Sequence, residues 1–192
     1  MEFKELVKKR RSCRAFSADE VPKEKLDAVI EVACWAPSPL NLQPWEFVII
    51  TQPKVKTRIR EISEEARRTV VDQSGPAWTA KYDMRFLEDA PVLIAVTCDP
   101  SRGGLGDFFG QRHGSLQAAS AAVQNLLLAA ADEGLGGLWF TFFAPEKMKS
   151  ILDVPENMEI AAIVPMGYPA VTPQNVPRKS ARVHHQKYGR TQ

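Results

Sequence analysis

Apolar positions spaced three and four residues apart predict helices in several parts of the chain. The clearest is 115–133, which is apolar over most of its circumference, so we expect it to be buried. Pro22 suits a first helical position, and the helix that it begins should end before Pro37, because a proline pushes the preceding residue out of helical geometry. The other predicted helices run from Phe3 to the basic residues at 10–14, from Pro53 to about Val71, and from Pro145 to Leu152.

Short runs of aromatic and β-branched residues predict strands at 45–51, 91–97, 138–142 and 160–166. The second run is continuously apolar, which suits a strand buried on both faces. Segment 77–88 fits either a short helix or an ordered loop, and the glycine-rich segment 102–110 is predicted to be a mobile loop. Helices and strands alternate irregularly without internal repeats. This pattern indicates one domain over residues 1–192, a sheet flanked by helices of the α+β or α/β class.

The tail from Ala170 onward contains prolines, few apolar residues and no helical period. Such a segment has no core of its own, so it should lie extended over another surface. Together with the strongly apolar helix at 115–133, it suggests a homodimer in which the tail, about 170–192, wraps the partner subunit.

Bulk composition narrows the classes of function. The chain has 192 residues, of which 44% are hydrophobic and 25% charged, and its formal net charge is +2. This excess is too small to indicate a nucleic-acid or membrane partner. No apolar run approaches the roughly 20 residues that cross a bilayer, and the N-terminus lacks an apolar signal core. Three scattered cysteines suggest reduced thiols, so we expect a cytoplasmic protein.

Three arginines and a serine lie together between positions 10 and 14. Guanidinium groups form bidentate, charge-assisted hydrogen bonds to phosphate, and Ser12 adds a neutral donor. Arg10, Arg11, Ser12 and Arg14 are therefore candidates for a phosphate site. A solvated surface patch is the alternative, and the cluster alone does not decide between them.

A polar loop with rigid prolines, APSPLNLQPW at 36–45, lies between a predicted helix and a predicted strand. Asn41 and Gln43 each donate and accept hydrogen bonds, so they suit the edge of a ring that carries carbonyls and nitrogens. Capping within the loop by Asn41 and Ser38 is the alternative role.

These two segments together resemble the N-terminal signature of the FMN-dependent nitroreductase family. The matching stretches are RRSCRAF at 10–16 and APSPLNLQPWEFVII at 36–50. GLGGLWFTFF, IVPMGYP and PRKSARVHH follow in the order and spacing of that family, so the resemblance covers nearly the whole chain. It implies an α+β, nitroreductase-like fold, with a central, mainly antiparallel sheet flanked by helices and an extended C-terminal tail.

The resemblance also implies the parts of an FMN site. In this family the first motif binds the FMN phosphate, the second lies along the flavin and the ribityl chain, and a C-terminal arginine returns to the phosphate. The implied phosphate and ribityl contacts are Arg10, Arg11, Ser12 and Arg14, with Arg178 as second anchor; the implied isoalloxazine contacts are Pro37, Ser38, Asn41 and Gln43, with backbone from Trp139, Phe140 and Thr141.

The C-terminal motif departs from the family pattern. The family usually continues with a Pro-Leu-Glu-Glu-like stretch, where this chain has Ser-Ala-Arg-Val at 180–183. Arg178, Lys179 and Arg182 therefore stay open as alternative phosphate anchors. The role of segment 77–88, which lines the substrate pocket in many relatives, also stays open. Its Arg85 fits either the N1/O2 edge of the flavin or an ordinary surface position.

Several other residues favour structural roles over chemical ones. Gly104 and Gly106 follow a predicted strand, but Phe109 stands where a dinucleotide fingerprint has its third glycine. The histidines lack metal-ligand spacing, so no metal site is expected. Cys13 is expected to be a packing residue and Trp45 a core residue, whereas the role of Trp139, in the core or against a ligand, stays open.

The resemblance implies an FMN-dependent oxidoreductase that takes hydride from NAD(P)H and reduces nitroaromatic, quinone or similar acceptors in a ping-pong cycle. We assign no residue as a catalytic acid or base, because the flavin carries the redox chemistry. A flavin-cleaving synthase and a reductive dehalogenase are alternatives within the family, and a non-catalytic flavin-binding protein is a further one. The physiological acceptor and the preference for NADH or NADPH stay open.

Overall fold

The computed structural model describes residues 2–189, except for the side chain of residue 107. The helices are α1 (Phe3–Lys9), α2 (Lys23–Cys34), α3 (Pro53–Asp72), α4 (Phe86–Asp89), α5 (Gly114–Asp132) and α6 (Pro145–Leu152). The strands are β1 (Trp45–Ile50), β2 (Val92–Cys98), β3 (Gly136–Gly137) and β4 (Glu159–Gly167), and short 3₁₀ helices form η1 (Pro39–Asn41), η2 (Ala77–Lys81), η3 (Pro100–Arg102) and η4 (Gly104–Phe109).

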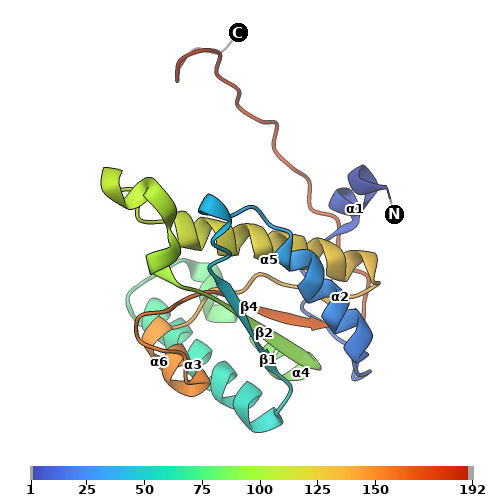
Figure 1. The fold of residues 1–192 in the computed structure, drawn as a ribbon. Coiled ribbons are helices and arrows are strands. Elements are labelled where there is room, and N and C mark those ends of the chain that lie inside the picture. Colours follow the sequence, from blue (N-terminus) through green and yellow to red (C-terminus); the bar gives the residue numbers. More distant parts are fainter. Residues whose placement is uncertain (1, 190–192) are drawn as a thin grey trace.

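The strands form a single sheet in the order β1-β2-β4-β3, and every neighbouring pair is antiparallel. This arrangement confirms the α+β fold with a mainly antiparallel central sheet. α2 and α5 cover one face of the sheet, and α3 and α6 cover the other (Figure 1). Every residue of β2 is buried, as its continuous apolar run predicted, because the strand lies between two others and helices cover both of its faces.

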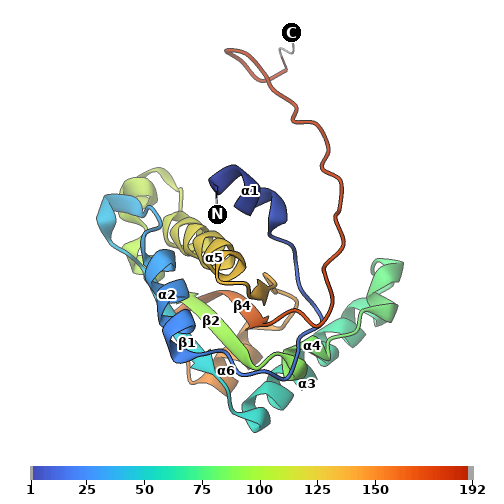
Figure 2. The ribbon, with the colours of Figure 1, turned by 90° about the vertical axis from the view of Figure 1, so that its right-hand side faces the viewer.

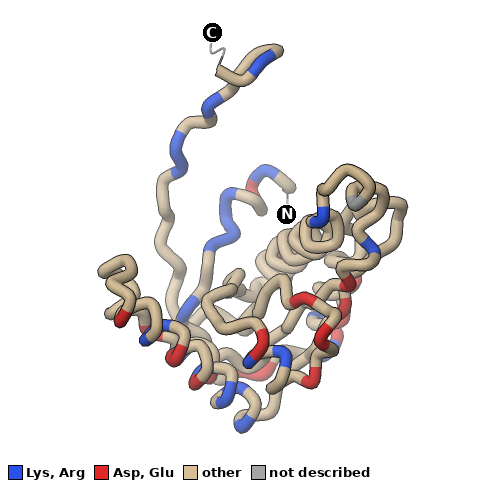
Figure 3. Tube along the Cα trace, turned by 90° about the vertical axis from the view of Figure 1, so that its left-hand side faces the viewer, with Lys and Arg blue, Asp and Glu red and all other residues tan. Residues whose placement is uncertain are grey.

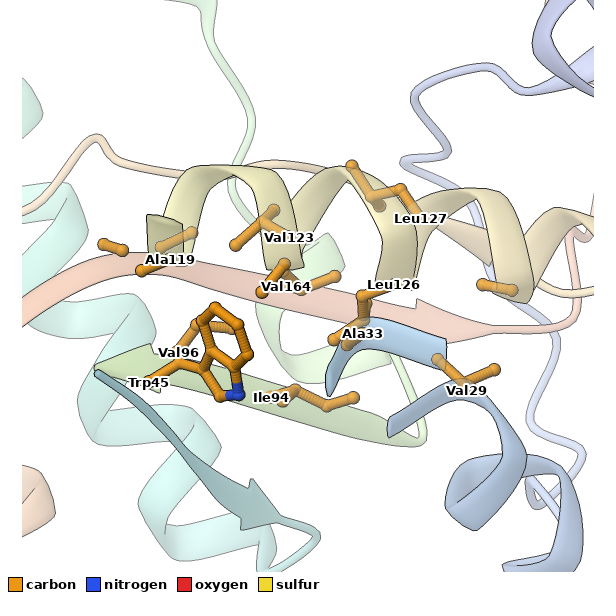
Figure 4. Packing of buried hydrophobic residues seen from close by; sticks show 14 of the residues in the cluster. Val29, Ala33, Trp45, Ile94, Val96, Ala119, Val123, Leu126, Leu127 and Val164 are labelled. Carbon is orange, nitrogen blue, oxygen red and sulfur yellow. The ribbon is translucent and has the colours of Figure 1, made fainter. Parts of the chain in front are cut away.

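α5 packs across the sheet through its buried alanine, valine and leucine residues. Ala119, Val123 and Leu126 point toward Ile94 of β2 and Val164 of β4 (Figure 4). Alanine side chains let a helix approach a sheet closely, so an apolar helix of this composition is stable only when buried. The expectations that this helix and Trp45 belong to the core are confirmed.

The strand expected at 138–142 is wrong. β3 contains only Gly136 and Gly137, and beyond it Phe140 makes an isolated bridge, exchanging backbone hydrogen bonds of 3.0 and 2.9 Å with Ile163. The chain turns directly afterwards, because the Phe143 N–H donates to the Thr141 carbonyl. The aromatic run reflects burial of Phe140 rather than a continuous ladder.

Two segments that the sequence left unassigned or predicted to be a loop contain short helices. Segment 77–88 is mixed, since η2 and α4 flank a short connection. Segment 102–110 is not the open loop that its glycines suggested: it contains the end of η3 and all of η4. Asp99 begins η3 by accepting a hydrogen bond from the Ser101 N–H, at 2.9 Å.

The tail leaves the body beside the N-terminal segment. Pro169 bridges Phe16, and the Ala170 N–H donates to the Ala15 carbonyl at 2.9 Å. Beyond this point the chain runs extended and away from the domain, from the end of the molecule that carries α1 (Figure 2). Its apolar side chains Val171 and Val176 are exposed. The extended form agrees with the sequence-based expectation.

Candidate functional site

A cavity of ≈540 Å³ lies between the basic segment that follows α1 and the first part of the tail. Arg10, Arg11, Ser12 and Arg14 line it, and Arg178 approaches from the tail. The floor is fixed by β3, because Ser12 bridges Gly137 and the Cys13 N–H donates to the Gly137 carbonyl at 3.0 Å. Lys179 and Arg182 are not among the lining residues.

This cavity is strongly cationic. Partial burial lowers the pKa of the Arg10 guanidinium, and the nearby Arg178 and Arg11 lower it further. Among residues 2–189, none of the cavity's arginines forms an ion pair with a carboxylate. Figure 3 shows the basic positions of this segment and of the tail. Guanidinium groups held close together without an acidic partner favour binding of an anion.

Arg11 connects the two walls of the cavity. Its guanidinium donates to the Lys8 carbonyl at the end of α1 and to the Arg10 carbonyl at 2.7 Å. It also donates to the side-chain oxygen of Asn175 in the tail. These bonds hold the basic segment and the tail together around the cavity.

A second cavity, of ≈570 Å³, adjoins the first and has aromatic walls. Its lining includes Trp139, Phe140 and Thr141 from the segment after β3, and Trp78 and Tyr82 from segment 77–88. The Tyr82 ring lies edge-on to Trp78, with 5.4 Å between ring centroids, and 6.1 Å from the ring of Phe86. Tyr82 is thus held in place by its aromatic neighbours.

Arg14 lines both cavities. Its Nε donates to the Tyr82 hydroxyl at 3.3 Å, and its guanidinium carbon lies 5.8 Å from the centre of the Tyr82 ring. Trp78 and Tyr82 both lie in segment 77–88, whose role the sequence leaves open, and none of the sequence motifs singles out Tyr82. The feature of the sequence that could have indicated these residues is the spacing of aromatic residues at 78, 82 and 86. They lie in a segment that the pattern could not assign to a helix or a loop.

Hydrogen bonds between its own residues fix the conformation of the proline-rich loop at 36–45. The Gln43 N–H donates to the Ser38 hydroxyl at 3.0 Å, and the Gln43 side chain donates to that of Asn41 at 3.3 Å. Leu40, Asn41 and Gln43 all have positive φ, at 50°, 54° and 45°. The hydrogen bonds internal to the loop are therefore present, and they hold the polar side chains in one arrangement.

This loop lies at the opposite end of α5 from the cationic cavity. At the N-terminal end of α5, Pro39 packs beside Gly104, and Gly103 lies against Gly114. The cationic cavity instead adjoins Gly136 and Gly137, just after the C-terminal end of α5 (Figure 1). The 19 residues of α5 span about 28 Å. Within one chain, the loop residues Pro37, Ser38, Asn41 and Gln43 are therefore not brought together with the arginines.

The model of the nitroreductase family matches residues 7–168. The chain belongs to the nitroreductase family. It is 29% identical over 177 residues to a protein of Methanothermobacter thermautotrophicus provisionally named NADH dehydrogenase/NAD(P)H nitroreductase, covering 90% of this chain and 80% of that protein. It is 32% identical over 201 residues to iodotyrosine deiodinase 1 of Sus scrofa, covering 93% of this chain but 65% of the longer pig protein.

A solved structure of a nitroreductase-family relative agrees with the fold over nearly its whole length. It is oxidized iodotyrosine deiodinase bound to FMN and 3-iodo-L-tyrosine, with a TM-score of 0.85 and 28% sequence identity. The match covers 96% of this chain and 99% of that chain.

Other residues of this nitroreductase-family chain that the sequence raised as candidates lie outside the two cavities or have packing roles. Cys13 is buried, and its burial raises the pKa of the thiol, so the packing role expected for it is supported. Arg85 forms an ion pair with Asp83 and is exposed. Over the described part of the chain, no group of three metal-ligating side chains occurs. No described helix is long and apolar enough to cross a membrane.

Proposed function

We propose that this protein is an FMN-dependent oxidoreductase that uses NAD(P)H to reduce aromatic acceptors such as nitroaromatics and quinones. The observation that carries the proposal is the pair of adjoining cavities joined at Arg14, one cationic and the other aromatic. Their volumes of ≈540 and ≈570 Å³ are within the ordinary range for cofactor and ligand pockets, about 300–1,000 Å³.

The cationic cavity fits the FMN phosphate. Arg10, Arg11 and Arg178 would provide charge-assisted hydrogen bonds, and Ser12 a neutral donor. Arg14 would lie between the phosphate end and the ring end of the cofactor, and the backbone of 139–141 beside the ring. Bound FMN would supply the hydride-transfer chemistry, and the protein would bind it, orient it and exclude water from its ring.

The loop at 36–45 lies far from the cationic cavity of its own chain, and this separation is the reason to propose a homodimer. A second copy related by two-fold symmetry would place the loop of each subunit over the aromatic cavity of the other, forming two identical sites. Asn41 and Gln43 would then reach the ring edge of a cofactor held by the partner subunit. An apolar hollow of ≈330 Å³ between α1, α2 and α5, with the exposed Phe3 and Trp35 in its lining, supports contact with a second copy.

The test begins with a visible absorption spectrum of protein incubated with FMN and freed of excess cofactor. We expect a bound-flavin spectrum, which bleaches on anaerobic addition of NADH or NADPH and returns on addition of a nitroaromatic or a quinone. The nucleotide that bleaches faster is the preferred donor. A colourless protein that takes up no FMN, or a flavin that neither nucleotide reduces, would contradict the proposal.

Reductive dehalogenation is a second candidate, favoured by the likeness to the deiodinase structure at a TM-score of 0.85. In that reaction two electrons and a proton convert an aryl carbon–halogen bond into a carbon–hydrogen bond and a halide ion. Halide released anaerobically from a halogenated phenol, with one equivalent of reduced nicotinamide consumed per halide, would support it. Turnover of quinones without halide release would restrict the protein to the first function.

A further inference from the structure

The aromatic cavity contains almost no charge. In the part of the chain that the structure describes, Arg14 is the one charged residue of its lining, and the others are neutral: Val70, Pro76, Trp78, Thr79, Tyr82, Trp139, Phe140, Thr141 and Phe142. Because Arg14 already lies beside Tyr82 and lines the phosphate cavity, the protein side chains that an acceptor would meet beside the flavin ring are mostly apolar rings and methyl groups. No carboxylate of the described residues 2–189 is among those that line this space.

Two carboxylates near the cavity wall, those of Asp83 and Glu64, are paired with a cation. Asp83 forms an ion pair of 2.7 Å with Arg85, which holds the pKa of Asp83 below its ordinary range. On α3, Glu64 pairs with Arg67 at 2.7 Å, and the same guanidinium donates to the carbonyls of residues 79 and 80 behind the cavity wall. An incoming ammonium group would have to displace one of these partners.

We propose that the acceptor is an aromatic molecule without an ammonium group, neutral or anionic, and that free amino acids with aromatic side chains are excluded. This inference rests on the proposed function and narrows its substrate class. The zwitterion of 3-iodo-L-tyrosine, bound in the related deiodinase structure, needs a partner for its ammonium group. Burying that cation without a partner is unfavourable, whereas a ring alone gains from burial against Trp78 and Phe142.

Cation–π attraction does not replace the missing carboxylate. Aromatic rings attract cations over their faces, but the guanidinium of Arg14 is already 5.8 Å from the centre of the Tyr82 ring. A second cation there would be repelled by Arg14. The loop expected from a partner subunit contributes the neutral side chains Pro37, Ser38, Asn41 and Gln43.

A series of probes that share one iodinated ring tests the inference. The oxidized holoprotein is titrated with 2-iodophenol, 3-(4-hydroxy-3-iodophenyl)propanoate, 3-iodotyramine and 3-iodo-L-tyrosine, and binding is measured by quenching of flavin fluorescence. We expect dissociation constants for the phenol and the propanoate at least about tenfold lower than for the two ammonium-bearing probes, since tenfold is only 1.4 kcal/mol. Equal or tighter binding of 3-iodo-L-tyrosine would overturn the inference, and so would binding of none of the four.

A charge-introducing variant tests the physical reason. Val70 is half-buried at the cavity wall, so Val70→Glu supplies the missing carboxylate and Val70→Gln is the matched neutral control. We expect Val70→Glu to bind 3-iodotyramine about tenfold more tightly than Val70→Gln does, with less change for 2-iodophenol. No difference between the two variants would contradict the charge argument. If circular dichroism shows that the Val70 variants are unfolded, Thr141→Glu and Thr141→Gln serve instead.

The failure of this inference is separable from failure of the proposed function. FMN uptake and bleaching by NAD(P)H are measured on the same sample before the probes are added. Quenching of the tryptophan fluorescence of Trp78 and Trp139 reports probe binding even in protein without flavin. If the protein is reduced normally but binds 3-iodo-L-tyrosine most tightly, the proposed function is supported and the exclusion of amino acids is contradicted.

Discussion

Arg14 differs from the other arginines of the basic segment in what surrounds its side chain. Arg11 is bonded to two backbone carbonyls and to Asn175, so its role is partly to hold the tail. Within residues 2–189, the Arg14 side chain donates one hydrogen bond, to the neutral Tyr82 hydroxyl, and so keeps most of its guanidinium donors for a ligand. Its position between the two cavities makes it the residue on which cofactor binding should depend most.

Replacement of Arg14 tests this dependence. We expect Arg14→Ala to weaken FMN binding about 10- to 100-fold, because a hydrogen bond to a charged group contributes about 1.5–3 kcal/mol. Arg14→Lys should recover part of the loss, since it keeps the charge without the planar fork. Arg85→Ala is the matched control, because Arg85 is exposed and paired with Asp83. The measurement is the dissociation constant from FMN fluorescence. If Arg14→Ala binds FMN normally, Arg14 does not contribute to FMN binding.

At the scale of elements, β3 has an importance that its length does not suggest. It is two glycines long, yet it holds the basic segment through the bridge to Ser12. A Cβ at Gly136 would lie 2.7 Å from the Cβ of Cys13 and 2.9 Å from its sulfur. Gly136 has no room for a side chain because the basic segment approaches it closely, whereas a Cβ at Gly137 would lie 2.8 Å from the Leu127 side chain of α5.

The variant Gly136→Ala tests whether this close approach positions the phosphate site. We expect weaker FMN binding together with a lower thermal midpoint, because Cys13 must move and the arginines on either side move with it. Gly134→Asn is the control: Gly134 has φ of 77° with open space around it, and Asn tolerates that conformation. If Gly136→Ala binds FMN as the parent does, β3 is not what places the arginines.

At the scale of the whole molecule, the residues of the candidate site lie at the two ends of α5, and the tail extends from one of those ends. The tail contacts its own domain near Ala15 and Arg11 and then departs from it (Figure 2). It supplies Arg178 to the cationic cavity of the same chain. A homodimer would give the rest of the tail, and the loop at 36–45, a surface to cover.

Removal of residues 171–192 separates the two roles of the tail. We expect the shortened chain to keep its helical circular dichroism, because both core clusters lie before residue 170. It should lose FMN affinity, through loss of Arg178, and shift from dimer toward monomer in sedimentation velocity. Full-length Arg178→Ala should lose affinity while staying dimeric. Unchanged sedimentation of the shortened chain would show that the tail does not hold the dimer together.

The sequence by itself determined the features that depend on local order. The apolar period located α5 and its burial, the continuous run at 91–97 identified the strand covered on both faces, and proline positions predicted the limits of α2. Burial and backbone geometry follow directly from the residues in such stretches, because their period matches the period of the element. The motifs also identified Arg10, Arg11, Arg14 and Arg178, which line one cavity.

Only the tertiary structure decided which distant residues meet. The run at 138–142 has strand propensity, but the pairing of Phe140 with Ile163 is an isolated bridge, which depends on how the chain leaves β3. The contact of Tyr82 with Arg14 and the separation of the loop from the arginines by the length of α5 are likewise relations between remote segments. Periodicity carries no information on such relations, because long-range packing sets them rather than the conformation of either segment alone.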